Sequence, residues 1–152
     1  MADLALDTAA SLVTGDGQRS TFAAEVSADW AIWGPMGGYV AAIALRAAGA
    51  HCGRARPAST NANFLAVAEY GSVDVTVTTL RATRVASCVR VEITQQGRPI
   101  LDAVVWGTDT DEGLEHRADR RRPDLPGPDG LASFEDRLTA AGEEIPYEFW
   151  KR

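Results

Sequence analysis

The sequence predicts an α+β fold in which a curved antiparallel sheet wraps around one long central helix. The first observation is that residues 40–50 are small and apolar, with Arg46 as the only charged residue among them. A helix that is apolar nearly all round is typical of a buried helix. The second observation is that the segments after Pro57 alternate apolar and polar residues between short turns, as antiparallel strands do. A single buried helix needs a sheet to cover it.

Composition limits the classes of function. The chain has 152 residues, 45% of them hydrophobic, which is enough for one domain with a core. Its net charge of −6 argues against a nucleic-acid or anionic-membrane partner. No segment is long enough to span a membrane and the N-terminus has no basic leader, so we expect a cytoplasmic protein. Cys52 and Cys88 have no metal-ligand spacing, and we expect no metal site.

The first half of the chain predicts a strand, a turn and the helix. Residues 21–26 predict the first strand, and Ser27 or Asp29 can begin a short helical turn. Residues 33–38 read Trp-Gly-Pro-Met-Gly-Gly, a tight turn that leads into a helix from about residue 36 to residue 51. Gly49 and Gly53 supply stop signals.

Four strands are predicted after the helix, over residues 59–67, 72–80, 85–94 and 100–106. The last of these is apolar on both faces, which indicates a central or interface strand. Tyr70-Gly71 and residues 96–99 predict hairpin turns.

The sequence changes character after Thr108. We predict a first domain over residues 1–110 and a linker over residues 111–152 that is rich in proline, glycine and charge. Within the linker, residues 131–141 predict a short helix. Residues 145–152 contain three aromatic side chains and resemble the lead-in to a further unit.

Several segments together resemble a known family. They are residues 29–42 (Asp-Trp-Ala-Ile-Trp-Gly-Pro-Met-Gly-Gly-Tyr-Val-Ala-Ala), Arg56-Pro57, residues 63–65, Leu80-Arg81 and residues 89–98. Over residues 20–108 the chain is similar to the N-terminal half of bacterial acyl-CoA thioesterase II-type proteins, the double hot-dog thioesterases. The resemblance implies a hot-dog fold and hydrolysis of an acyl-CoA thioester, with coenzyme A present only as part of the substrate and no other cofactor.

Two departures from the family pattern matter. Met36 stands where the family usually has Asn, which removes a polar group from the turn. The family's catalytic Asp, Thr and Gln belong to the second hot-dog unit, so no catalytic residue carries over to this chain. Where that unit has its Gln on the last strand, the equivalent strand here offers Trp106.

Thioester hydrolysis needs donors for the developing oxyanion and a base for the water. Backbone N–H groups at a helix N-terminus can supply the donors, so Gly37 and Gly38 are catalytic candidates. The alternative is that these glycines only permit close packing of the helix on a strand.

The base is harder to assign. Asp102 is the candidate acid, because its strand face also holds Ile100, Val104 and Trp106 and burial there would raise its pKa. The alternative is that Asp102 pairs with an arginine. His51 lies about 20 Å from the glycine turn by helical rise and is expected to cap the helix C-terminus.

Substrate-binding candidates surround the turn. Four could line an acyl channel or belong to the core: Trp33, Met36, Tyr39 and Phe64. Asn61 and Asn63 could hydrogen-bond a ligand or serve the fold. Four arginines could contact coenzyme A phosphates or remain solvated surface charges: Arg54, Arg56, Arg81 and Arg84.

We therefore expect an acyl-CoA thioesterase. The alternative is a non-catalytic hot-dog half that binds acyl groups or supports a catalytic partner domain, and a hydratase is disfavoured because no histidine lies near the turn. A homodimer or a second hot-dog domain is the expected partner, because a single sheet leaves an open edge. The acyl site would lie between Gly37-Gly38 of one unit and the strand around residues 61–65 of the other.

Overall fold

The structure of the chain is a computed structural model that describes residues 3–110, 124–125 and 127–144. The chain divides into two compact units, Met1–Asp111 and Glu112–Arg152. The charged run over residues 117–122 and the aromatic segment over residues 145–152 lie outside the described residues.

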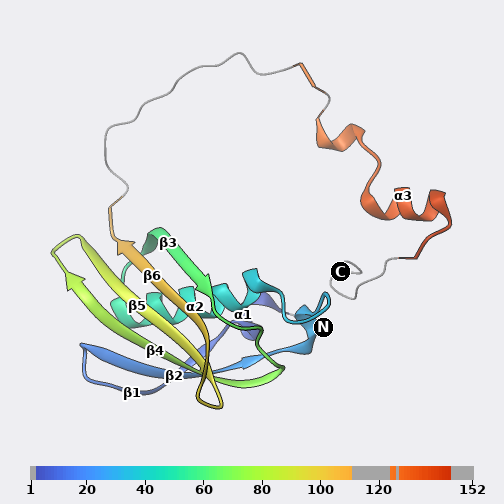
Figure 1. Cartoon of the computed structure of the whole chain (residues 1–152). Coiled ribbons are helices and arrows are strands. Elements are labelled where there is room, and N and C mark those ends of the chain that lie inside the picture. Colours follow the sequence, from blue (N-terminus) through green and yellow to red (C-terminus); the bar gives the residue numbers. More distant parts are fainter. Residues whose placement is uncertain (1–2, 111–123, 126, 145–152) are drawn as a thin grey trace. The chain divides into compact units, whose positions relative to one another are not determined.

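The first unit is a single sheet with a long helix against one face (Figure 1). Its elements are α1 (Leu4–Asp7), β1 (Ala10–Gly15), β2 (Arg19–Val26), the 3-10 turn η1 (Ala28–Trp30), α2 (Gly37–Cys52), β3 (Arg56–Phe64), β4 (Gly71–Ala82), β5 (Ala86–Gln95) and β6 (Arg98–Thr108). The strand order is β1-β2-β4-β5-β6-β3, and all neighbours are antiparallel. The predicted α+β architecture, with a curved antiparallel sheet around one long helix, is confirmed.

The core lies between α2 and the sheet. Alternate residues of the central strands are apolar and buried, and the register pairs Val77 with Val91 and Val91 with Ala103. Ile43 of α2 is completely buried in the same cluster. The two-residue period of the strands therefore places one apolar face under the helix.

The helix is covered on one side only. The buried residues of α2 are Tyr39, Val40, Ile43, Ala44, Ala47 and Ala48. Gly38, Arg46, Gly49 and Ala50 are exposed, so the expectation that the helix is buried all round is wrong. A single sheet layer reaches one face of a helix, and alanines and glycines leave little apolar area on the other.

Strand connectivity corrects one predicted turn. β6 lies between β5 and β3, as its apolar character predicts, and the β5–β6 hairpin turns at Gln96 and Gly97, both with positive φ. Tyr70-Gly71 is not a hairpin turn, because β3 pairs with β6 whereas β4 pairs with β2 and β5. Residues 65–70 instead leave the edge strand β3 and cross to the other half of the sheet.

The N-terminal region is more ordered than its weak pattern suggests. Asp3 caps α1, and β1 adds an edge strand beside β2. Ser27 accepts from the N–H of Asp29 and begins η1. Among the described residues, no helix combines the length and apolar character that crossing a membrane requires.

The second unit contains a 3-10 turn η2 (Pro128–Gly130) and the helix α3 (Phe134–Ala141). Ser133 and Asp136 form a reciprocal capping box at the start of α3, which explains why the helix begins there. The helix predicted within residues 131–141 is confirmed.

Candidate functional site

The glycine-rich turn is a compact structure that ends at the first residue of α2. Ala31 pairs with Pro35 in a short bridge, and the N–H of Ile32 donates to the carbonyl of Gly34. The N–H of Met36 donates to the carbonyl of Trp30. These bonds fix the direction in which the helix N-terminus points.

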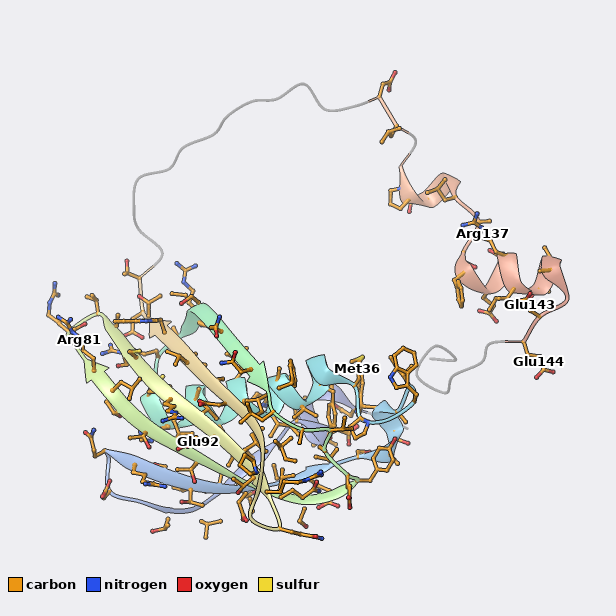
Figure 2. The ribbon with its side chains drawn as sticks, in the orientation of Figure 1. Met36, Arg81, Glu92, Arg137, Glu143 and Glu144 are labelled. Atoms are coloured by element: carbon orange, nitrogen blue, oxygen red, sulfur yellow. The ribbon has the colours of Figure 1, made fainter. Side chains whose placement is uncertain are left out.

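Two backbone donors at this end have no acceptor in the part of the chain that the structure describes. Met36 is the N-cap residue and gives no side-chain bond, while its carbonyl accepts from the N–H groups of Tyr39 and Val40. Within the described part of the chain, the N–H groups of Gly37 and Gly38 donate to no acceptor. Figure 2 shows Met36 at this end of α2. Such a helix end favours a negatively charged or partly charged oxygen.

The two glycines differ in what surrounds them. A Cβ at Gly37 would lie 3.3 Å from Cζ of Phe64, whereas a Cβ at Gly38 would meet nothing within 4 Å. Neither residue has a positive φ. Close packing therefore accounts for Gly37 but not for Gly38.

A cavity of about 310 Å³ opens beside these donors. It lies between the start of α2, the end of β3 and the start of β6. Its lining residues are Pro35, Gly37, Val40, Phe64, Leu65, Ala66, Val67, Ala68 and Ile100. These described lining residues are apolar and none of them is titratable, so the cavity suits an apolar group attached to a polar head at the glycines.

Residues 65–68 form one wall of the cavity. The sequence does not predict this wall, because its pattern favours a strand as far as residue 67. The N–H groups of Leu65 and Ala66 both donate to the carbonyl of Ile100, and this ends the β3 ladder at Phe64. The buried amide of Gln95 holds the following residues, since it accepts from the N–H of Glu69 and donates to that residue's carbonyl. The signal in the sequence is the continuous run Leu-Ala-Val-Ala, which does not alternate.

The structure separates the aromatic candidates. Phe64 lines the cavity, while Trp33 is 88% exposed at the tip of the turn and Met36 packs against the core. Tyr39 is buried, and its ring stacks on Trp30 with centroids 5.5 Å apart.

The hydroxyl of Tyr39 is used by the fold. It accepts a hydrogen bond from the N–H of Ser27. Its oxygen lies 2.8 Å from the carbonyl oxygen of Asp7 and 2.9 Å from that of Glu25, and these two acceptors share its one proton. Burial raises the pKa of Tyr39. The structure therefore places this side chain between α2, β2 and α1, away from the cavity.

Three polar candidates lie on the face of the sheet that points away from α2. Asn61 and Asn63 are exposed and pair in register with Val104 and Asp102, whose neighbours Leu101 and Ala103 face α2. The structure therefore does not bring Asn61, Asn63 or Asp102 to the glycine turn. Figure 2 shows Glu92 of β5 on the same outer face.

Asp102 is held by an arginine. Nε and Nη2 of Arg90 donate to its two carboxylate oxygens at 3.0 Å and 2.6 Å, and Glu92 lies 3.7 Å from the same guanidinium. The hydrogen bonds from Arg90 lower the pKa of Asp102. The raised pKa expected from apolar neighbours is wrong, because the side chain faces outward and has a cationic partner.

His51 and Arg54 also serve the fold. The two ring nitrogens of His51 each lie 2.8 Å from a hydroxyl, of Ser20 and of Thr79, and burial lowers its pKa. Arg54 binds Asp109 and the hydroxyl of Ser87. Among the residues that the structure describes, no cluster of three or more His, Cys, Asp or Glu could hold a metal ion.

A second cavity, of about 230 Å³, lies at the other end of α2 between Cys52 and Pro57. Its lining includes three arginines, Arg46, Arg54 and Arg56, and it adjoins the carbonyl end of the helix, where the dipole disfavours negative charge. The glycine end is therefore the better candidate site.

An exposed apolar patch adjoins the candidate site. It consists of Trp33, Phe64, Leu65 and Val67, which are 55–88% exposed. The patch continues from the end of β3, the edge strand whose residues are nearly all exposed. Apolar patches beside an open sheet edge are typical of interaction surfaces.

The fold has close relatives among solved structures. A protein from Alicyclobacillus acidocaldarius described as having a hot-dog fold is 26% identical with a TM-score of 0.72, over 86% of this chain and 48% of its own. A candidate thioesterase II from Thermobifida fusca is 24% identical with a TM-score of 0.69, over 82% and 45%. A hypothetical thioesterase from Streptococcus pneumoniae, solved with coenzyme A, is 15% identical with a TM-score of 0.61, over 71% and 94%. No protein of curated function matches the sequence.

The sheet order, the central helix and these relatives define a hot-dog domain. The sequence model of the family described as the acyl-CoA thioesterase N-terminal domain matches residues 26–108 of this chain. The chain belongs to this family, as its glycine turn and strand pattern predict. It spans about half the length of the first two relatives.

Proposed function

We propose that this chain is the N-terminal hot-dog half of an acyl-CoA thioesterase, and that the N–H groups of Gly37 and Gly38 hold the oxyanion formed during thioester hydrolysis. The observation that supports this proposal is the pair of unused amide donors beside an apolar cavity. The acyl chain would lie against Phe64 and Ile100. Coenzyme A would enter as part of the substrate, with no further cofactor.

Preorganised amides act on the transition state more than on the substrate. The carbonyl oxygen gains negative charge as water attacks, and donors that already point at it need no rearrangement. Loss of one such donor typically costs about 10²–10³ in kcat. The N-terminal dipole of a 16-residue helix adds to this stabilisation.

In this proposal the base comes from another hot-dog unit, because none of the described residues that line the cavity is titratable. The open edge of β3 and the exposed apolar patch beside it favour a partner that continues the sheet. The partner would be a second hot-dog domain or a second copy of the chain. Because Phe64 and Leu65 of the same chain already line the cavity, the partner would complete the acyl site from the side of the exposed patch.

A second candidate is a hot-dog half that binds acyl groups, or supports a catalytic partner, without hydrolysing the thioester. The wholly non-titratable set of lining residues in the described part of the chain favours this alternative. Hydrolysis of acyl-CoA by the full chain separates the two candidates. No turnover at any acyl length would leave only the non-catalytic function.

The substitution Gly38→Ala tests the oxyanion role. The added methyl group has open space in the protein, so the fold should tolerate it, but it projects where a thioester would approach. We expect hydrolysis to fall by about tenfold or more with no loss of thermal stability. Gly49→Ala is the matched control, since Gly49 is also exposed in α2 with nothing within 4 Å. Equal activities of the two variants would refute the role of Gly38.

A further inference from the structure

Phe64 occupies an unusual position for a large aromatic residue. It is the last residue of the edge strand β3, it is 55% exposed, and it lies outside the buried core cluster. Its register partner on β6 is Leu101, so its side chain lies on the α2 side of the sheet. The core therefore does not require a phenyl ring at this position.

The ring is instead directed at the start of α2. A Cβ built on Gly37 would lie 3.3 Å from Cζ and 3.4 Å from Cε1 of Phe64. The tip of the ring thus fills the space that a side chain at the first helical position would take. Gly37 and Phe64 also both line the apolar cavity.

This placement puts the ring beside the two free amide donors. If the thioester carbonyl is held by Gly37 and Gly38, as the proposed function requires, the acyl carbons next to the carbonyl must pass the ring to enter the cavity. We infer that Phe64 is a specificity-determining residue, whose ring limits the width of the acyl group next to the thioester carbonyl. The substrates it favours are acyl groups that are unbranched at that carbon.

The test compares two isomeric ligands on the full chain. Ketone analogues of butanoyl-CoA and isobutanoyl-CoA, with a methylene between carbonyl and sulfur, resist hydrolysis and differ only in branching beside the carbonyl. Phe64→Ala should raise the affinity for the isobutanoyl analogue relative to the butanoyl analogue by about tenfold, the range expected for space of this size. Phe134→Ala is the matched control, because Phe134 is a similarly exposed phenylalanine in the other unit. It should leave the ratio unchanged.

Hydrolysis of the two true thioesters is measured in parallel. A changed affinity ratio without hydrolysis would support the role of Phe64 and refute the thioesterase function. Hydrolysis together with an unchanged affinity ratio in Phe64→Ala would support the thioesterase function and refute the role of Phe64. Failure of the unsubstituted chain to bind either analogue would refute both. Phe64→Leu, which keeps an apolar side chain at the strand end, should give a smaller change in the same direction and guards against misfolding of the alanine variant.

Discussion

Asp102 illustrates how one step along a strand decides what a side chain can do. Its neighbours Leu101 and Ala103 face α2 and are buried, so Asp102 must face the other side of the sheet. There it meets Arg90, its diagonal neighbour on β5, while Glu92 is its direct register partner. Apolar residues around an acid in the sequence therefore do not imply a buried acid, because they can occupy the opposite face.

The bond to Arg90 predicts a dependence of stability on pH. The folded-state pKa of Asp102 is lowered, so its contribution to stability is present above the unfolded value, about 3.9, and is lost as pH falls through the folded value. Because the pair is partly exposed, we expect Asp102→Asn to reduce the free energy of unfolding at neutral pH by at most about 1 kcal/mol. Urea denaturation of both proteins at neutral and strongly acidic pH measures this loss of stability. If the two proteins still differed in free energy of unfolding in acid, the bond between Asp102 and Arg90 would not be its cause.

At the level of elements, periodicity located the central helix and the strands around it. It failed at residues 1–19, because β1 is an edge strand with Leu12 and Val13 both exposed and gives no alternation. The glycine turn was predictable from composition. The cavity wall over residues 65–68 was not, because the bonds from Leu65 and Ala66 to Ile100 depend on a strand far along the chain.

Gly107 near the end of β6 lies close to the C-terminal end of α2 and the residues after it. A Cβ there would lie 2.9 Å from Cβ of Arg54 and 3.1 Å from Sγ of Cys52. We expect Gly107→Ala to lower the free energy of unfolding by about 1–3 kcal/mol, since Cβ of Arg54 cannot move without shifting the backbone that follows the helix. Thermal and denaturant unfolding measure the loss, with Gly49→Ala as the control that adds a methyl group to open space. Equal stability of both variants would show that the contact relaxes freely.

At the level of the whole molecule, the edge strand β3 is exposed along nearly its whole length and ends at the patch of Trp33, Phe64, Leu65 and Val67. The first two solved relatives are about twice as long as this chain. We propose that the same edge pairs with a second hot-dog unit, or with a second copy when the chain is alone.

Sedimentation velocity of the isolated chain tests this association. We expect a species of two chains, which Asn61→Lys combined with Asn63→Lys should dissociate, because an edge pairing of two copies brings like charges close together. Ser11→Lys combined with Thr14→Lys places the same charges on the opposite edge strand β1 and should leave the association intact. Dissociation by the β1 substitutions but not by the β3 substitutions would place the interface at β1 and contradict the proposal.

The irregular register of β1 between Leu12 and Thr14 has a consequence for assembly size. An extra residue at that point increases the local twist of β1, so the free border of this strand no longer presents a regular row of hydrogen-bonding groups to a further strand. A molecule with two equally receptive borders would add neighbours without limit, as growing fibrils do. With one border spoiled, growth would stop once the other is occupied, and an assembly formed through β3 would close at two units.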